Sequence, residues 1–484
     1  MSLTTAFNVA LSGLTAAGRA SGVVSGNIAN AMTPGYARRT LELSGNVVGG
    51  GVTASGITRH ADPVLIANRR ATDAEHGHAQ ALDAFHGGLE SLIGSVDDPG
   101  SIVNRLADFE SGLIAAASNP GSKSRLDGAV HDARALAASI SGAAEGLRDL
   151  RSDADRRIGQ MVTQLNTSLE QVERLNGKIR AVELSGSDSS TLVDQRQALV
   201  DGINTLIPIR IAQRGDGEIA LYSEGGAILL DGRAVEIGFE PAAETRPHMS
   251  VDNGLLSGLE IAGRPVRTLG PQSVIRGGAL AAQFEIRDTH TVEAQKDLDA
   301  LARDLVERMQ DPGVDPTRTP GDAGLFTDNG TAFSPANAAG LANRLEVHVA
   351  VDPLRGGDSW RLRDGLGAPV PGSPGDASLL NALGDALGRS RPQPTPRFGT
   401  GALDSAGVGA ALLSRTAEAA GQTSRALSFA AASRTEMQRL EAQAGVDTDA
   451  ELQALMRIEQ AYAANARVLQ VVEELTDTLM RLGT

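Results

Sequence analysis

The sequence contains no cysteine, few aromatic residues and no long apolar run. Without cysteine the chain can form no disulfide, no thiolate nucleophile and no cysteine-based metal site. Aromatic residues make up only 3% of the 484 positions, so the cores must be built mainly from alanine, leucine, valine and isoleucine. A transmembrane helix needs about 18 consecutive apolar residues, and no such run occurs. These absences exclude thiol-dependent enzymes and helical membrane-spanning proteins.

Positive charge is also scarce. The 44 Lys and Arg against 59 Asp and Glu give a formal net charge of −15, spread along the chain. This balance argues against nucleic acid or an anionic membrane surface as the main partner. No positive charge precedes the first apolar stretch, and the first charged residue is Arg19, so we expect export, if any, without a cleaved secretory signal.

Each end of the chain carries apolar or small residues at alternating steps of four and three, which predicts a helix with a heptad stripe. The N-terminal stripe comprises Leu3, Phe7, Ala10, Leu14, Ala17, Ser21, Val24 and Ile28. The C-terminal stripe comprises Leu455, Ile458, Tyr462, Asn465, Leu469, Val472, Thr476 and Leu479. A long helix with so narrow a stripe is marginal alone. We therefore expect the two ends to pair as a coiled coil, and we expect Asn465 and the larger stripe residues to form an assembly interface.

Two ordinary amphipathic helices of a globular bundle are the alternative interpretation of the ends. Helices on a globular surface usually carry charges on their outer face. The first 18 positions of this chain carry none. The uncharged outer face favours burial against neighbouring subunits.

A turn motif follows the N-terminal helix. Residues 27–36 read Asn-Ile-Ala-Asn-Ala-Met-Thr-Pro-Gly-Tyr, in which Asn30 can end the helix and the Pro-Gly pair makes a tight turn. This stretch resembles the signature of flagellar rod, hook and hook-associated proteins, and residues 460–467 resemble the matching signature of their terminal helix. The resemblance assigns the turn to Asn27, Asn30, Thr33, Pro34, Gly35 and Tyr36. Ala37 and Arg39 depart from the usual Ser and Gln of that signature.

A long helical block follows. This part of the chain, unlike the two ends, distinguishes rod, hook and hook-associated proteins from one another. The pattern predicts helices over 62–92, 97–118 and 123–184, interrupted by Asp-Pro-Gly at 98–100 and Asn-Pro-Gly at 119–121. Hook proteins and most rod proteins turn to β structure soon after the first signature, so this block matches them poorly.

Several local pieces resemble the hook-associated protein 1 family. They are Ser118-Asn119-Pro120 followed by Arg125, and residues 175–179, 194–199, 277–287 and 291–310. Their order along the chain carries the resemblance, which covers about two thirds of the sequence. It implies an inner domain of paired terminal helices, a helical rod domain and an outward β-rich insertion.

The sequence predicts the insertion independently. Apolar residues alternate over 207–212, and Asp231-Gly232 separates two short apolar runs, as in a hairpin. We expect a mainly α fold of three domains: 1–60 with 440–484, 61–202 with 274–439, and the β-rich 203–273. Within the second domain, 341–400 is expected to be β structure and loop, with a strand at 345–351, further β pattern at 360–362, loop over 365–400 and helix again from 402 to 444.

No catalytic, cofactor or metal site is expected. His76, His78 and His86 form the one histidine cluster, which we interpret as solvated because no His-Glu-x-x-His motif completes it. Gly49-Gly50-Gly51 lacks the strand, Lys and Ser or Thr of a phosphate loop. Arg214-Gly215-Asp216 spells an integrin-binding tripeptide, which we interpret as ordinary turn chemistry.

The expected function is that of a structural junction subunit between hook and filament. The resemblance implies self-assembly into a tube, contact with hook protein and with a neighbouring hook-associated protein or flagellin, and type III export with a chaperone to an extracellular location. We expect the terminal helices to be largely disordered until assembly. A hook or distal rod subunit is the alternative within the class. An adhesin or an enzyme displayed on a filament is the alternative outside it.

Overall fold

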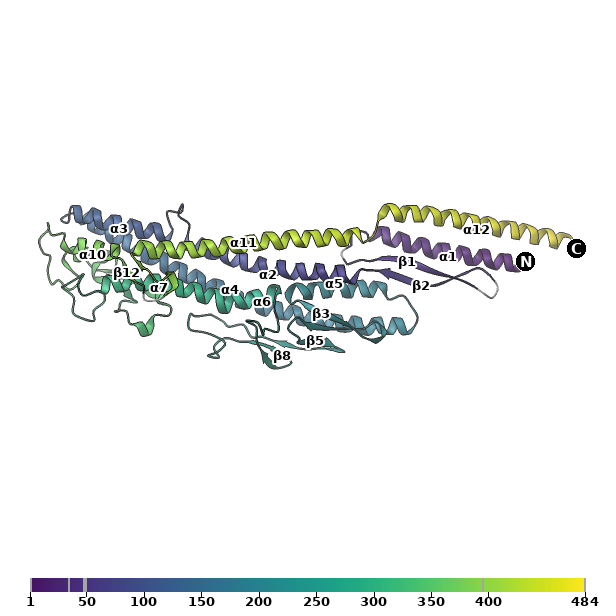
Figure 1. Ribbon diagram of the computed structural model, residues 1–484, viewed down its shortest axis with the longest axis horizontal. Helices are drawn as coiled ribbons and strands as arrows, with labels where there is room; N and C mark the ends of the chain where they lie inside the picture. The colour runs from purple at the N-terminus through teal and green to yellow at the C-terminus, as the bar shows by residue number, and fades with distance from the viewer. Residues whose placement is uncertain (1, 34, 47–49, 394–395, 483–484) are drawn as a thin grey trace.

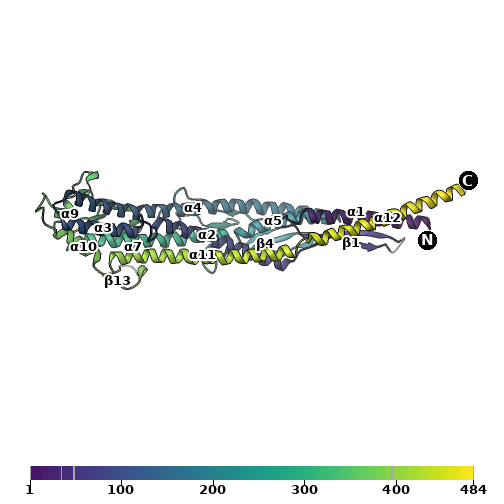
Figure 2. The same cartoon turned by 90° about the horizontal axis from the view of Figure 1, so that it is seen from above.

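The computed structural model describes residues 2–33, 35–46, 50–393 and 396–482. The molecule is long and narrow, and both chain ends lie at the same end of it (Figures 1 and 2). Helices dominate, and the β structure is confined to small sheets, so the mainly α prediction is confirmed. Over the described residues, no helix combines the length and apolar character needed to cross a bilayer.

One end of the molecule is a terminal unit made from both chain ends. Helix α1 (Leu3–Ala29) lies beside α12 (Thr448–Leu482). An antiparallel hairpin of β1 (Arg38–Gly45) and β2 (Val52–His60) packs on α1. The sequence pattern did not predict this hairpin. The interpretation that the glycine run at 49–51 lacks a neighbouring strand was wrong: Gly50 and Gly51 directly precede β2, and Gly49 lies outside the described residues.

Five long helices run along the rod. They are α2 (Pro63–Ile93), α3 (Ile102–Ser118), α4 (Lys123–Leu184), α7 (Thr291–Gln310) and α11 (Ser405–Gln443). Capping side chains mark where α2 and α3 begin. Asp62 accepts hydrogen bonds from the Val64 and Leu65 N–H groups, and Ser101 accepts one from the Asn104 N–H. The predicted helices are confirmed, except that α3 begins at Ile102 rather than at residue 97.

Shorter helices complete the rod. Helix α5 (Ser190–Leu206) returns along α4, and α6 (Gly278–Glu285) leads through the π-helical turn η2 (Ile286–His290) into α7. The remaining α-helices are α8 (Leu341–Arg344), α9 (Arg361–Asp364) and α10 (Ser378–Gly388). The 3-10 turns are η1 (Gly215–Gly217), η3 (Pro335–Asn337), η4 (Val349–Val351), η5 (Pro353–Arg355) and η6 (Pro396–Phe398).

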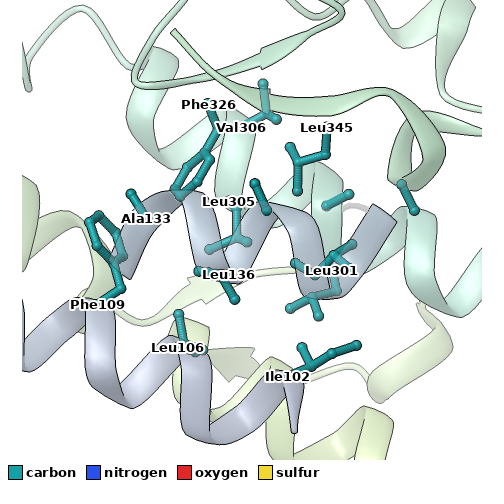
Figure 3. Packing of buried hydrophobic residues seen from close by; sticks show 14 of the residues in the cluster. Ile102, Leu106, Phe109, Ala133, Leu136, Leu301, Leu305, Val306, Phe326 and Leu345 are labelled. Atoms are coloured by element: carbon teal, nitrogen blue, oxygen red, sulfur yellow. The ribbon is translucent and has the colours of Figure 1, made fainter. Parts of the chain in front are cut away.

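The buried apolar residues form two clusters, one inside the rod and one where α4 meets α5 and the small sheets. Figure 3 shows Phe109 of α3 and Leu136 of α4 facing Leu305 of α7, with Phe326 closing the far side. Phe109 and Phe326 are fully buried and meet edge to face, with ring centroids 5.6 Å apart. The apolar residues whose spacing predicted α4 are therefore buried along most of that helix.

Two small sheets lie beside the rod. The first has the order β3 (Ile209–Gln213), β4 (Ile219–Ser223), β5 (Ile228–Asp231) and β6 (Arg233–Ala234). The second has the order β7 (Ile237–Gly238), β8 (Leu259–Ile261) and β9 (Arg264–Val266). They occupy the predicted insertion, but its first residues are wrong because α5 continues to Leu206.

Buried charge ties these sheets to the rod. Arg287 of η2 is fully buried, donates to Asp155 of α4 over 2.8 Å and stacks near Phe239 and Phe284. It also donates to the Ser257 carbonyl, which belongs to the segment leading into β8. One guanidinium thus holds three parts of the chain together.

The segment at 341–400 differs most from the prediction. The strand predicted at 345–351 is only β11 (Leu345–Val347), which pairs with β10 (Phe326–Asp328), because the chain turns as η4 directly afterwards. Residues 361–364 are helical rather than extended. The loop predicted over 365–400 contains α10, whose Leu380, Leu383 and Leu387 are buried in the rod core. Strands β12 (Arg391–Pro392) and β13 (Ala402–Leu403) pair close to the start of α11.

Candidate assembly site

The terminal unit leaves much of its apolar surface uncovered. Of the 35 residues of α12, only Glu451 and Val472 are buried. Beside Val472, four apolar side chains recur at steps of three or four and stay about half exposed: Val468, Val471, Leu475 and Leu479. Phe7 and Leu11 of α1 are 43% and 46% exposed. A stripe of this kind is typical of a surface that other chains cover.

The predicted stripes fall into three groups in the structure. Ala10, Ala17 and Val24 of α1 and Val472 of α12 are buried. Leu3, Leu14, Ser21, Ile28, Leu455, Ile458, Asn465 and Leu469 are half-buried. Phe7, Tyr462, Thr476 and Leu479 are exposed. The stripe around Val468, Val471 and Leu475 lies outside the predicted positions.

The two terminal helices approach closely at Gly13. A Cβ atom added to Gly13 would lie 2.8 Å from Asn465 Nδ2, closer than real side chains come. Asn465 itself donates to the Ala461 carbonyl of its own helix, over 3.0 Å. A side chain at position 13 would therefore require the Asn465 side chain to move.

Asn27, in the last turn of α1, is the centre of a polar cluster. It is fully buried, and its Oδ1 accepts from the Tyr36 hydroxyl over 2.9 Å and from the Arg39 N–H over 3.0 Å. Its Nδ2 donates to the Arg39 carbonyl over 2.8 Å and to Glu451 Oε2 over 3.0 Å. The amide thereby uses donors and acceptors together and holds α1, β1 and α12 in one cluster.

Glu451 completes this cluster from the C-terminal helix. Its side chain is 1% exposed, and Arg38 Nε donates to its Oε1 over 2.6 Å. A buried carboxylate requires such partners, because burying an unpaired charge is costly. The pair joins positions that are 413 residues apart in sequence.

The rest of the signature turn supports this cluster. Asn30 ends α1 and donates to the Gly26 carbonyl over 2.9 Å, and Thr33 donates to Asn30 over 3.3 Å. Gly35 has a φ of 80°, which suits glycine, and lies close to α5. Pro34 lies outside the described residues. Burial of Tyr36 raises the pKa of its hydroxyl, against the nearby Arg39 charge, which lowers it.

A second group of charges joins the terminal unit to the rod. Asp194 of α5 accepts from Arg39 over 2.5 Å and from Arg59 over 2.7 Å, so it holds both strands of the hairpin. Arg59 also donates to Gln197 over 2.6 Å. These pairs are largely shielded from water, which strengthens them relative to surface pairs.

A third group lies where α2, α5 and α11 meet. Arg69 of α2 pairs with Asp73, with Asp201 of α5 and with Glu441 of α11, at 2.5–2.6 Å. Burial alone would lower the pKa of Arg69, but the Asp201 and Glu441 carboxylates reverse this, and the pKa is raised. The end of α11, just before the break that leads to α12, is thus held to the rod.

Sequence reasoning missed Arg38, Arg59, Asp194 and Glu451. The run at 194–199 was noticed as a family resemblance, without any role for its charges. Arg39 was noted only as a departure from the usual residue, yet its backbone bonds Asn27 and its side chain bonds Asp194. No motif in the sequence distinguishes Glu451 from the other acids of the C-terminal segment, such as Asp449 and Glu459.

The histidine interpretation was wrong for His86. This ring is buried between Phe85 and His290, whose centroids lie 5.0 and 5.1 Å away. Burial, with a smaller effect of His290, lowers the pKa of His86 to about 4. His78 lies 3.1 Å from Glu285. No group of three or more metal-binding side chains occurs in the part of the chain that the structure describes.

Comparison with known proteins places this site in a class. The profile of flagella basal body rod proteins matches residues 7–36, and the C-terminal profile of the flagellar basal body rod FlgEFG proteins matches residues 438–482. These two ranges fall on α1 with its turn and on α12. They define the class as flagellar axial proteins.

A match in the middle of the chain indicates which kind of flagellar axial protein it resembles. The helical-domain profile of flagellar hook-associated protein FlgK matches residues 87–323. Flagellar hook-associated protein 1 of Bacillus subtilis is 22% identical over 96% of both chains, and that of Escherichia coli is 23% identical over 98% of this chain and 99% of its own. The chain is thus similar to the flagellar hook-associated protein 1 family over nearly its full length.

A solved structure is also similar in part. The flagellar hook junction protein FlgK from Burkholderia pseudomallei is 22% identical and aligns with a TM-score of 0.45. The alignment covers 54% of this chain and 46% of that chain.

Proposed function

We propose that this chain is the structural junction subunit between the flagellar hook and filament, and that it is not an enzyme. Similarity to the hook-associated protein 1 family over nearly the full chain supports the junction role. The single observation that supports assembly with other chains is the apolar stripe of α12, which lies beside α1 and is not covered. Burial of that stripe against neighbouring copies and axial partners would supply the driving force.

The paired terminal helices would form the inner wall of a tube. We propose that α1 and α12 interlock as a coiled coil, with Gly13 allowing their close approach at Asn465. Gly13→Val would place a branched side chain where Asn465 lies. We expect this variant to lose assembly, while Gly18→Val, at an open position, retains it. Equal assembly of both variants would contradict the proposed interlocking.

We propose that the chain is divided into three domains. The inner domain would comprise 1–60 and 440–484, the rod domain 61–206 and 274–439, and the outer domain 207–273, which starts after the end of α5. The Asp194 and Arg69 ion pairs would then act as the joints between the inner and rod domains. Limited proteolysis that removes both chain ends and leaves one resistant rod fragment would support this division.

Export would precede assembly. We propose that the chain leaves the cell unfolded through the flagellar type III apparatus, with a chaperone on its C-terminal helix, and acts outside the cell. The terminal helices would order fully only on assembly. Circular dichroism of the monomer and of a chain lacking 1–60 and 440–484 tests this step. Loss of the full helical signal of those residues on truncation would contradict it.

The alternatives differ in what they require. A hook or distal rod subunit shares both ends but lacks the long helices matched at 87–323. An adhesin would need a free recognition loop, whereas Arg214 of the Arg-Gly-Asp tripeptide pairs with Asp231 at 2.9 Å and bonds Tyr222. Binding of host-cell receptors by the full chain, lost in Asp216→Ala, would revive the adhesin role.

Gene deletion followed by electron microscopy tests the proposed function. We expect intact hooks without filaments, and flagellin shed into the medium. Absence of hooks would instead indicate a rod or hook subunit. Normal filaments on the deletion strain would overturn the junction role.

A further inference from the structure

The tripeptide Asp-Asn-Gly occurs twice in the chain, at residues 252–254 and 328–330. An asparagine before a glycine is chemically labile, because the glycine has no Cβ to keep its backbone nitrogen away from the asparagine amide. In both tripeptides the asparagine and the glycine are exposed. Since sequence and exposure are the same, a difference in reactivity must come from how the fold holds each asparagine.

The side chain of Asn253 is held in place. Its Nδ2 donates to the His248 carbonyl over 2.7 Å, and its Oδ1 accepts from the Ser250 and Leu255 N–H groups over 3.0 and 3.2 Å. The Gly254 N–H donates to a backbone carbonyl over 3.1 Å. The two groups that would have to meet are therefore both engaged elsewhere, and freeing them means breaking several hydrogen bonds.

A third Asn-Gly pair, at residues 176–177, is protected by burial. Asn176 lies inside α4 and is 5% exposed. Its Nδ2 donates to the Ile219 carbonyl over 2.8 Å, and its Oδ1 accepts from Arg196 over 2.8 Å. The helical backbone of α4 keeps the glycine nitrogen of this pair in the hydrogen-bond ladder.

Asn329 lacks both kinds of protection. With Gly330 it forms a two-residue turn, closed by hydrogen bonds in both directions between Asp328 and Thr331, over 2.9 and 3.0 Å. Asn329 and Gly330 have positive φ angles of 49° and 79°, as in a type I′ turn. Among the residues that the structure describes, none bonds the Asn329 side chain.

The backbone nitrogen of Gly330 is held by a side chain. Its N–H donates to the Thr327 hydroxyl over 3.0 Å, and that hydroxyl donates to the Glu346 carbonyl over 3.3 Å. Strand β10 pairs with β11 through main-chain groups. The bond to Thr327 can therefore open while the strand pairing remains.

We propose that Asn329 is a site of spontaneous deamidation in the folded chain. The Gly330 nitrogen attacks Cγ of Asn329 and forms a C–N bond, the nitrogen loses its proton, and the Cγ–Nδ2 bond breaks with release of ammonia. Water then opens the succinimide ring at either of its carbonyl groups. The products are aspartate and isoaspartate at position 329, and water is the co-reactant.

Either product changes the turn. Both add a carboxylate beside Asp328, and isoaspartate also lengthens the backbone of the turn by one methylene. The Asn329 N–H donates to the Arg344 carbonyl over 2.8 Å, and the Arg344 side chain pairs with Asp328 at 2.6 Å. A two-residue turn tolerates little change in backbone length. We therefore expect isoaspartate to break the bond between the turn and the end of α8.

Peptide mapping of the full-length protein, incubated folded at mildly alkaline pH, tests the proposal. Mass spectrometry follows the change from amide to carboxylate at all three Asn-Gly pairs. We expect product at Asn329 to accumulate at least about tenfold faster than at Asn253, because the hydrogen bonds of Asn253 must break first. In urea the two identical tripeptides are equally free, and their rates should become equal. Equal rates in the folded chain, or the same difference in urea, would overturn the proposal.

Two matched variants check which asparagine reacts. Asn329→Gln should remove most of the isoaspartate that an isoaspartyl methyltransferase labels in the incubated protein, because the longer side chain forms its ring far more slowly. Asn253→Gln should leave that labelling almost unchanged. Labelling that persists in Asn329→Gln, or that is lost in Asn253→Gln, would also overturn the proposal. These measurements are made on the protein in solution, so either outcome leaves the junction role untouched.

Discussion

The rod and the terminal unit are both built from long helices, yet they bury very different amounts of apolar surface. Helix α4 buries twenty of its 62 residues, whereas α12 buries two of its 35. The rod core includes fully buried side chains such as Phe109, Leu136 and Leu301. The terminal unit keeps Val471, Leu475 and Leu479 about half exposed.

This difference separates folding from assembly within one chain. Core burial of the kind seen in the rod contributes stability to the isolated molecule. The stripe on α12 contributes little until another surface covers it. Substitutions in the rod should therefore change the free energy of unfolding, and substitutions on the stripe should change assembly.

Phe109→Ala is expected to have the largest effect on stability. The ring is fully buried against Phe326, and its removal would leave a cavity. We expect the free energy of unfolding of the rod to fall by about 3–5 kcal/mol, measured by urea denaturation. Phe429→Ala on the exposed side of α11 is the control, because Phe429 is 69% exposed. Its change should stay within about 0.5 kcal/mol, and equal losses from both would contradict the buried core.

Because of His86, we expect the free energy of unfolding of the rod to fall at acid pH. Burial lowers the pKa of His86 to about 4 in the folded chain, whereas the unfolded chain titrates near 6.5. The unfolded chain therefore binds the proton first as pH falls. The stability held above pH 6.5 is lost between there and about pH 4, by about 3 kcal/mol in total.

His86→Phe tests this pH dependence by keeping a ring without the titrating group. We expect its unfolding free energy to change less between pH 7 and pH 4 than that of the parent chain. His248→Gln, at an exposed site, is the control and should follow the parent. An unchanged profile for His86→Phe would contradict the buried neutral imidazole.

Glu451→Ala should loosen the terminal unit without affecting the rod core. The change removes the partner of Arg38 and leaves Asn27 Nδ2 with one acceptor fewer. In assembled flagella, where both helices are expected to be ordered, we expect amide exchange in α1 and α12 to become faster, equivalent to about 1–3 kcal/mol of local stability. Exchange in α4 should remain as before. Equal acceleration in α4 would mean that the cluster supports the whole molecule.

The helices were predictable because their cause is local. The apolar spacing of residues 123–184 and the Asp-Pro-Gly and Asn-Pro-Gly breaks fixed the rod helices to within a few residues. Helix α10 was missed because glycine and proline surround it, although its leucines at 380, 383 and 387 have helical spacing. The hairpin β1–β2 was missed because neighbouring helices, rather than strong strand composition, stabilise it.

The polar cluster was less predictable because its partners are distant in sequence. Asn27 and Glu451 are 424 positions apart, and no pattern in either segment points to the other. The resemblance singled out Asn27 and Tyr36 as part of a turn but not what they bond. Tertiary packing decides such contacts, so they appear only in the folded chain.

Leu479→Asp should have the smallest effect on stability and a large one on assembly. Leu479 is 57% exposed on α12, so the monomer loses little buried surface and its unfolding free energy should stay within about 0.5 kcal/mol. A carboxylate on the stripe would be buried without a partner when copies assemble, which is costly. We therefore expect hooks without attached filaments in electron micrographs of cells carrying this variant. Gln470→Asp, on the polar side of the same helix, adds the same charge and should leave filaments attached. Normal attachment in Leu479→Asp would mean that the stripe faces solvent in the flagellum, and the division between a folding core and an assembly surface would fail at α12.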